Sequence, residues 1–115
     1  MAIALARGIS PARVAAFKIL QQVEGGGYSS VLLAAEEPKL QALDRALCHE
    51  LVLGVLRWQL LLDRIVEHFS KRRVESLDLA VRIALRLGLY ELRFLTRIPS
   101  PAAVNESVNL VRMAR

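Results

Sequence analysis

The chain has 115 residues, of which 54% are hydrophobic and only 5% aromatic, and its formal net charge is +5 because sixteen lysines and arginines outnumber eleven carboxylates. A chain of this length fits one domain with an aliphatic core, and its single cysteine, Cys48, excludes an internal disulfide and a cysteine-ligated zinc site. Because no uncharged apolar run approaches the roughly 20 residues that span a bilayer, and the opening segment lacks the basic leader of a signal peptide, we expect a cytoplasmic protein.

Two helix starts share the letters Ser-Pro-Ala, at positions 10–12 and 100–102. In each, a serine hydroxyl can cap the helix while proline takes the first helical position, where a backbone N–H is not needed. From the first start, apolar residues recur at helical spacing until the glycines at 25–27 end the pattern. A short helix is predicted next, at about 31–37, and Pro38 stops it.

The middle of the chain carries a longer apolar pattern that begins after Asp44, a candidate N-cap. Its inward stripe reaches Trp58, which we interpret as a core residue. A break near Trp58–Gln59 separates this helix from a further one at about 60–69. Residues 70–76 then form a polar link.

The last third of the chain predicts two more helices. The first covers about 78–97 and ends before Pro99, because a residue preceding proline resists the helical conformation. The second begins at about 101, with three valines pointing inward: Val104, Val108 and Val111. No segment alternates like a strand, so the sequence predicts an all-α fold, a single compact bundle of about six helices.

The helix at 78–97 is apolar over most of its circumference, which predicts that it is the long, buried central helix. Its arginines fall within about 60° of one another at 100° per residue; they are Arg82, Arg86, Arg93 and Arg97. We interpret this stripe as the edge of the helix that reaches water, in preference to a direct contact with phosphate. Gly54 and Gly88 lie on inward arcs and are predicted to face each other where two helices cross closely.

Glu91 falls in the middle of the apolar arc of that central helix. A buried carboxylate without a partner would be very costly, so a partner is expected, and the role of Glu91 is interpreted as structural. The candidates are Arg45, Arg57 and the pair Asn105 and Asn109, and the sequence leaves the choice open.

No catalytic constellation emerges from the sequence. His49 and His68 lie far apart, and neither has another metal ligand at i, i+4 spacing, so no metal site is expected. Cys48 lies on the inward half of its helix, where an inert core thiol is expected. With no nucleophile beside a base, we expect this chain alone to have no catalytic residues and no enzyme activity.

Two basic clusters are the candidate RNA-binding residues. The first gathers at the start of the first helix, whose N-terminal dipole also favours anions; it consists of Arg7, Arg13 and Lys18. The second lies in the polar link and consists of Lys71, Arg72 and Arg73. Each could neutralise backbone phosphates without reading base sequence. The alternative is that these cations only solvate helix faces.

Three segments together resemble the NusB-like helical domain: "ARVAAFKILQQVEGGGYSSVLL", "DRALCHELVLGVLRWQLLLDRIV" and "RLGLYELRFLTRIPSPAAVNESVNLVR". The resemblance covers about residues 10 to 112. Within that family, the "GVLRWQ" and "GGGYSS" forms are similar to the N-terminal domain of the bacterial ribosomal RNA small-subunit cytosine-5 methyltransferases (RsmB or Sun). The resemblance implies an all-helical RNA-binding domain, with ribosomal RNA as its partner and the start of the first helix as its contact region.

The resemblance also implies what this sequence lacks. In the methyltransferases a Rossmann-like catalytic domain binds S-adenosylmethionine, and no part of it is present here, so no cofactor is expected in this chain. We therefore expect an N-terminal fragment of a methyltransferase whose further partners are a ribosomal protein or its own catalytic domain. An apolar groove should lie open beside the last helix, inviting partner binding or dimerisation. The alternatives are a transcription antitermination factor that binds leader RNA with a ribosomal protein, and a purely protein-interacting helical module.

Overall fold

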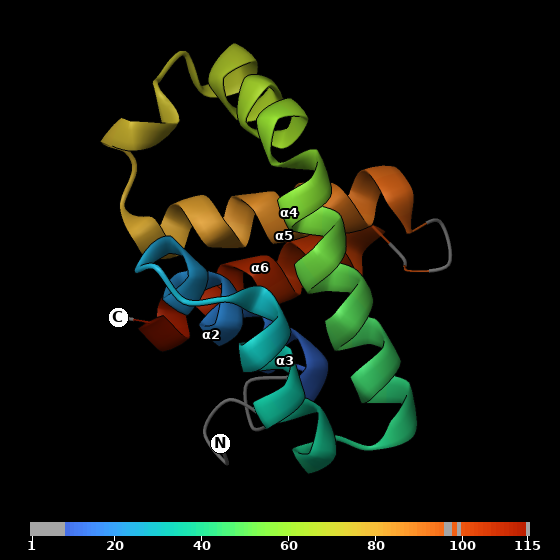
Figure 1. Cartoon of the computed structure of the whole chain (residues 1–115). Helices are drawn as coiled ribbons and strands as arrows, with labels where there is room; N and C mark the ends of the chain where they lie inside the picture. Colours follow the sequence, from blue (N-terminus) through green and yellow to red (C-terminus); the bar gives the residue numbers. More distant parts are fainter. Residues whose placement is uncertain (1–8, 96–97, 99, 115) are drawn as a thin grey trace.

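The computed structural model of the chain describes residues 9–95, 98 and 100–114. Within these residues it is all-α, as predicted, with five α-helices and two short 3-10 helices (Figure 1). In chain order these are α2 (Pro11–Glu24), α3 (Ser29–Glu36), η1 (Glu37–Lys39), α4 (Ala42–Ser70), η2 (Val74–Ser76), α5 (Leu79–Phe94) and α6 (Ser100–Ala114). Five helices replace the expected six because the two apolar patterns in the middle of the chain form one kinked helix, α4.

Helix α2 begins and ends as the sequence predicts. The Ser10 hydroxyl accepts a hydrogen bond from the backbone N–H of Arg13 at 3.3 Å, and Pro11 occupies the first helical position. The helix stops at the glycine run, where Gly26 has a φ of 102°, a conformation that residues with a side chain rarely adopt. Both ends are therefore set by local chemistry.

Helix α4 contains the predicted break. Trp58 has a non-helical backbone, with φ −104° and ψ 15°, and the helix changes direction there. Two predictions about α4 are wrong. The N-cap is Gln41, so Asp44 lies inside the first turn. Trp58 is not a core residue, because its indole is partly exposed and stacks on the ring of Phe94, with the two ring centroids 5.2 Å apart.

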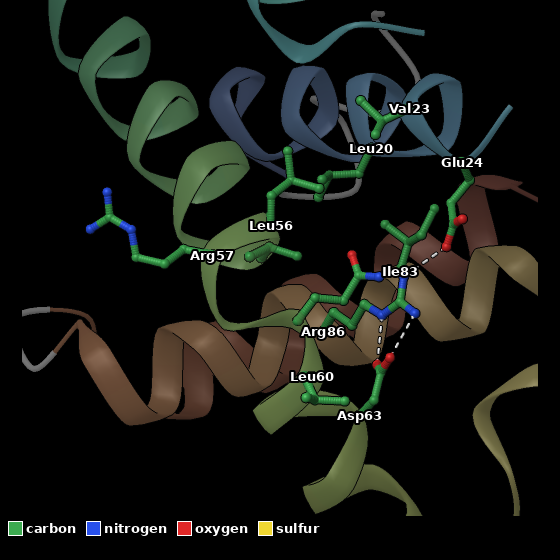
Figure 2. A pocket seen from close by; sticks show the side chains of 11 residues that line it. Leu20, Val23, Glu24, Leu56, Arg57, Leu60, Asp63, Ile83 and Arg86 are labelled. Atoms are coloured by element: carbon green, nitrogen blue, oxygen red, sulfur yellow. Dashed lines mark hydrogen bonds and ion pairs between the residues drawn. The ribbon is translucent and has the colours of Figure 1, made fainter. Parts of the chain in front are cut away.

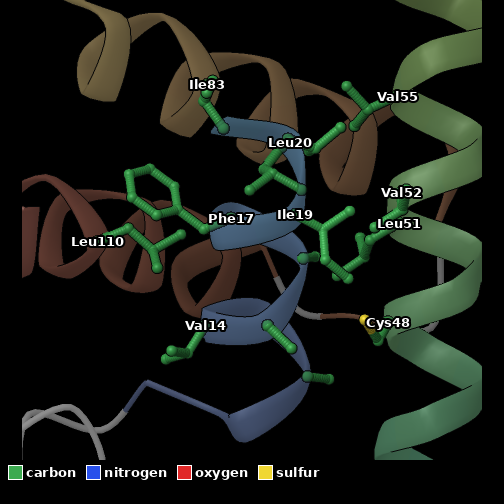
Figure 3. Packing of buried hydrophobic residues seen from close by; sticks show 14 of the residues in the cluster. Val14, Phe17, Ile19, Leu20, Cys48, Leu51, Val52, Val55, Ile83 and Leu110 are labelled. Atoms are coloured by element: carbon green, nitrogen blue, oxygen red, sulfur yellow. The ribbon is translucent and has the colours of Figure 1, made fainter. Parts of the chain in front are cut away.

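Helix α5 is the central helix, as predicted: it packs against α2, α4 and α6. Apolar side chains from all four helices fill the space between them (Figure 3); they include Phe17, Ile19 and Leu20 of α2, Leu51, Val52 and Val55 of α4, Ile83 of α5 and Leu110 of α6. Cys48 is buried among them. The helix ends at Phe94, and the last residues predicted for it, 96 and 97, lie outside the described residues.

The two helical glycines do not face each other, contrary to the prediction. A Cβ at Gly54 would overlap the ring of Tyr90 on α5, so this glycine lets α4 approach α5. A Cβ at Gly88 would lie 2.5 Å from the hydroxyl of Ser107, so this one lets α6 approach α5. Each glycine serves a different close contact of the central helix.

Helix α6 is rotated relative to the prediction. Val104 and Val108 are exposed, whereas Ala103, Asn109 and Leu110 are buried, and Val111 is half-buried against the core. The contact between Ser107 and Gly88 fixes this rotation, because the side of α6 that carries Ser107 must lie against α5. The expectation that the valines at 104 and 108 point inward is therefore wrong.

Candidate nucleic-acid interface

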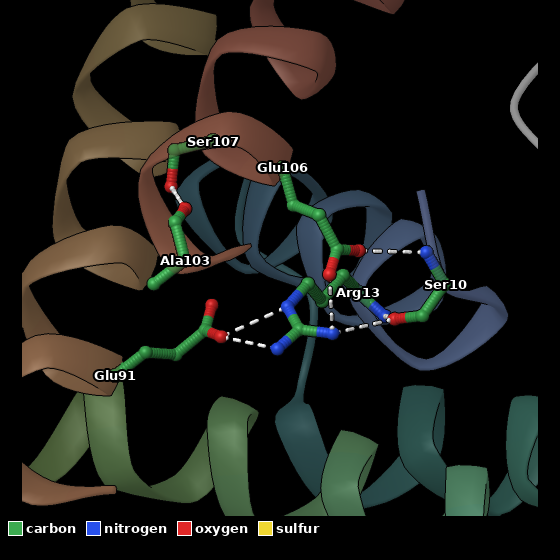
Figure 4. Close-up of polar contacts among 6 residues, drawn as sticks. All are labelled: Ser10, Arg13, Glu91, Ala103, Glu106 and Ser107. Carbon is green, nitrogen blue, oxygen red and sulfur yellow. Dashed lines mark hydrogen bonds and ion pairs between the residues drawn. The ribbon is translucent and has the colours of Figure 1, made fainter. Parts of the chain in front are cut away.

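Arg13, a predicted RNA-contacting residue, is buried in an ion-pair network (Figure 4). Its Nε donates to Glu91 Oε1 at 2.8 Å, and Nη1 lies 2.9 Å from Glu106 Oε2 and 3.0 Å from the Ser10 hydroxyl. Only 7% of the side chain is exposed. All three guanidinium nitrogens already contact carboxylate or hydroxyl oxygens and the side chain is buried, so it is not available to a phosphate. This position corrects the prediction: Arg13 belongs to the interior and not to a binding surface.

The same network gives Glu91 a partner, Arg13, that was not among the predicted candidates. Arg45 donates instead to the backbone oxygens of Glu37 and Leu40, at 3.0 and 2.9 Å. Burial raises the pKa of Glu91 above its usual range, while the hydrogen bond and charge of Arg13 oppose that rise. The hydrogen bond and charge of Arg13 therefore favour the ionised form of Glu91, against the larger effect of burial.

A second buried network involves Arg86 on the predicted arginine stripe (Figure 2). Its Nε and Nη2 donate to the two carboxylate oxygens of Asp63 at 2.7 and 3.0 Å, and Nη1 donates to Glu24 at 2.9 Å. Burial alone would lower the pKa of Arg86, but the hydrogen bonds to Asp63 and Glu24 outweigh it and raise the pKa. The prediction that this arginine reaches water is wrong, because three helices close around it.

The other three arginines of the predicted stripe differ in their surroundings. Arg82 is half-buried, donating to the backbone oxygen of Leu77 at 3.1 Å with Glu24 at 3.7 Å. Arg93 is exposed, as predicted, and its guanidinium lies 5.9 Å from the centre of the Phe94 ring. Arg97 lies outside the described residues. Of the three stripe arginines that the structure describes, Arg82 and Arg86 contact carboxylates of neighbouring helices, and Arg93 faces water.

Lys18 is exposed at the rim of a cleft between α2 and η1, with a volume of about 600 Å³. Lys39, also exposed, stands on the same rim and lies 3.4 Å from Glu36. The apolar part of the lining consists of Pro11, Val14, Ala15 and Leu40, and Gln41 together with the acidic Glu36 and Asp44 completes it. Sequence reasoning missed Lys39, because it lines the same cleft as Lys18 only through the packing of α3 against α2 and of η1 against α3.

The other predicted cations do not join this cleft. Arg7 lies outside the described residues. Lys71, Arg72 and Arg73 are exposed just after α4, where Lys71 adopts a left-handed conformation with φ 60° that ends the helix. Arg73 lies 3.5 Å from Glu75, and this pair is open to water. Figure 1 shows this segment at the end of the molecule opposite to the start of α2, so the two basic clusters are separate surfaces.

Nowhere in residues 9–95, 98 and 100–114 do three His, Cys, Asp or Glu side chains gather closely enough to hold a metal ion. Burial raises the pKa of the Cys48 thiol to about 11, with smaller contributions from the charges of Glu37 and Glu36, so the thiol is protonated and unreactive near neutral pH. None of the helices that the structure describes is both long and apolar enough to cross a membrane.

The part of the chain that the structure describes is therefore an all-helical domain with a cleft lined by two exposed lysines and with two buried arginine networks. The model of the NusB family matches residues 10–115, and the chain belongs to that family. Its relatives include the probable ribosomal RNA small subunit methyltransferase B of Synechocystis, 38% identical over 104 residues, which covers 88% of this chain and 23% of the relative. The Pseudomonas putida ribosomal RNA small subunit methyltransferase B is 37% identical over 97 residues, covering 84% of this chain and 22% of the relative.

A relative of another kind is the transcription antitermination protein NusB of Proteus mirabilis, 31% identical over 93 residues, or 80% of this chain and 68% of the relative. No solved structure gave a significant match. The chain thus spans less than a quarter of the length of the methyltransferase relatives but about two thirds of the antitermination protein. The similarity to the methyltransferases lies in their NusB-like part.

Proposed function

We propose that this chain is the RNA-binding domain of a cytoplasmic ribosomal RNA cytosine-5 methyltransferase. Its role is to position ribosomal RNA for methylation by a catalytic domain outside residues 1–115. S-adenosylmethionine is then a cofactor of that other domain, and none of the described residues here is assigned to it. The names of the two methyltransferase relatives and the family membership support this assignment.

The observation that carries the proposal is the cleft between α2 and η1, where Lys18 and Lys39 share one rim. Two exposed ammonium groups beside the first turns of a helix favour a phosphate backbone at that place. Arg7 and the trio Lys71, Arg72 and Arg73 remain proposed secondary contacts, whereas Arg13 is removed from the set.

The test is the affinity of the chain for fragments of small-subunit ribosomal RNA, measured by fluorescence anisotropy over a range of salt concentrations. Each lysine–phosphate interaction that a substitution removes should reduce the slope of log affinity against log salt by about 1, so the double variant K18E/K39E should lower it by about 2. Arg64→Glu is the matched control, because it reverses an exposed cation on α4 away from the cleft. An equal reduction with Arg64→Glu, or an affinity independent of salt, would contradict the proposal.

A second candidate function is transcription antitermination, favoured by the similarity to the Proteus mirabilis protein over 68% of its length. That function requires binding to leader RNA together with a ribosomal protein. Adding the ribosomal protein should then raise the affinity for leader RNA but leave the affinity for ribosomal RNA fragments unchanged. If neither RNA binds, the chain is a protein-interacting helical module, the third alternative.

A further inference from the structure

The outward side of the α5 and α6 pair is rich in exposed aliphatic side chains. Leu85 and Leu92 of α5 are 38% and 43% exposed, and Val104 and Val108 of α6 are 52% and 45% exposed. We call these four residues the α5/α6 apolar surface. On the α6 side it continues into a shallow groove of about 550 Å³, whose walls include Ser100, Pro101, Asn105 and Arg112. Apolar area exposed in this way commonly marks an interaction site.

The four side chains lie on one side of the helix pair. The contact of Gly88 with Ser107 marks the line where α5 and α6 touch, and a short connection makes the two helices antiparallel neighbours (Figure 1). At 100° per residue, Leu85 and Leu92 are rotated by about 40–60° from Gly88. Val104 and Val108 are rotated by about 60–100° from Ser107 in the same sense. Because the two helices run in opposite directions, rotations of the same sense away from their contact line turn all four side chains toward the same side of the helix pair.

The exposed charged residues that α5 and α6 themselves place beside this surface are arginines. Glu91 and Glu106 are the only acidic residues of α5 and α6, and both turn inward to Arg13, at 2.8 and 2.9 Å from its guanidinium. Exposed Arg93 follows Leu92 on α5, and exposed Arg112 stands one helical turn beyond Val108. The internal network therefore removes the acidic charges of this helix pair from its outer side and leaves arginines there.

We propose that the α5/α6 apolar surface binds an amphipathic helix of a protein partner, with aspartates or glutamates along the margins of its apolar stripe. An amphipathic helix laid in a groove is a recurring mode of peptide recognition, and margins of opposite charge give such a contact its specificity. Leu and Val side chains offer no ring on which a base could stack, which disfavours RNA as the ligand. A second copy of the chain would bring its own Arg93 and Arg112 against these arginines, which disfavours self-association.

The experiment uses two synthetic helical peptides of about 20 residues with the same leucine stripe, one with glutamates and one with lysines on both margins. Binding of each labelled peptide to the 115-residue chain is measured by fluorescence anisotropy. Two double variants remove the apolar and the charged contributions separately, V104Q/V108Q and R93E/R112E. Val31→Gln is the matched control, because Val31 is an exposed valine on α3. The contacted residues are mapped from amide chemical-shift changes.

The glutamate peptide should bind and shift the amides of α5 and α6, and each double variant should weaken it by about tenfold or more, whereas Val31→Gln should not. The lysine peptide should bind about tenfold more weakly or not at all. Equal affinity for both peptides, no saturable binding, or shifts confined to other helices would overturn the proposal. So would a dimer in sedimentation velocity that V104Q/V108Q dissociates, or a ribosomal RNA fragment that shifts these amides instead.

Discussion

Arg13 on α2 and Glu91 on α5 form a buried ion pair across 78 positions of sequence, with Nε and Oε1 2.8 Å apart. Glu106 on α6 completes the network from the other side of the guanidinium, at 2.9 Å from Nη1. One arginine near the start of α2 therefore ties the first helix to the last two. The network fixes the orientation of these helices and directs both acidic side chains of α5 and α6 inward.

Arg13→Met should destabilise the fold by about 3–5 kcal/mol, because it leaves the Glu91 carboxylate buried without its partner. The measurement is the free energy of unfolding in urea, followed by circular dichroism. Lys18→Met removes an exposed cation from the same helix and should change that free energy by no more than about 0.5 kcal/mol. Similar destabilisation in the two variants would show that the pair with Glu91 is not what stabilises this contact.

The same substitution should change how stability depends on pH. Burial raises the pKa of Glu91, and without Arg13 the remaining causes, burial and the charge of Glu106, both raise it further. A folded state with a raised pKa holds the proton more tightly than the unfolded chain does. The contribution of Glu91 to the free energy of unfolding is therefore present at acidic pH. It is lost as pH rises from the ordinary glutamate range through the pKa that Glu91 has in the folded chain.

Unfolding in urea at several pH values checks this sign. The gap in free energy of unfolding between the native chain and Arg13→Met should widen as pH rises above the ordinary glutamate range. Adding Glu91→Gln to Arg13→Met should remove the widening, because the titrating group is gone. A gap that stayed constant with pH would mean that removing Arg13 does not change the pKa of Glu91 in the folded chain.

Gly54→Ala should destabilise the fold even though alanine is the better helix former. The added Cβ would overlap the ring of Tyr90, and overpacking of this kind costs about 1–3 kcal/mol, against a gain of about 1 kcal/mol in helix propensity. Thermal melting measures the destabilisation. The substitution should cost less when made in a Tyr90→Leu background, and an equal cost in both backgrounds would show that the ring is not the obstacle.

Cys48 should resist thiol reagents in the folded protein. The thiol is buried and its pKa is about 11, so little thiolate exists near neutral pH and the reagent cannot reach it. The rate of reaction with a disulfide reagent should rise steeply in urea, as the chain unfolds. A cysteine placed at exposed Ser70 in a Cys48→Ala chain provides the comparison and should react at once without urea. Fast reaction of native Cys48 would show that this part of α4 opens readily.

The features that the sequence determined are those set within one or two helical turns. The Ser10 cap with Pro11, the stop at the glycines, the break at Trp58 and the inward Cys48 depend on neighbours in the chain, and all are present in the structure. The all-α class and the central position of α5 follow from the spacing and breadth of apolar faces. Periodicity gives this information because it depends on the helix alone.

Only the tertiary structure decided which side chains meet. The pairing of Arg13 with Glu91, the burial of Arg86 and the approach of Lys39 to Lys18 each join residues from separate elements. The exposure of Val104 and Val108 was likewise set by Gly88, which admits Ser107 and so rotates α6. A helix pattern identifies an apolar face but not the crossing point or rotation at which two faces pack, and a shift of one residue turns a helix by about 100°. An arginine that the sequence predicts to contact phosphate can therefore form an interior ion pair instead.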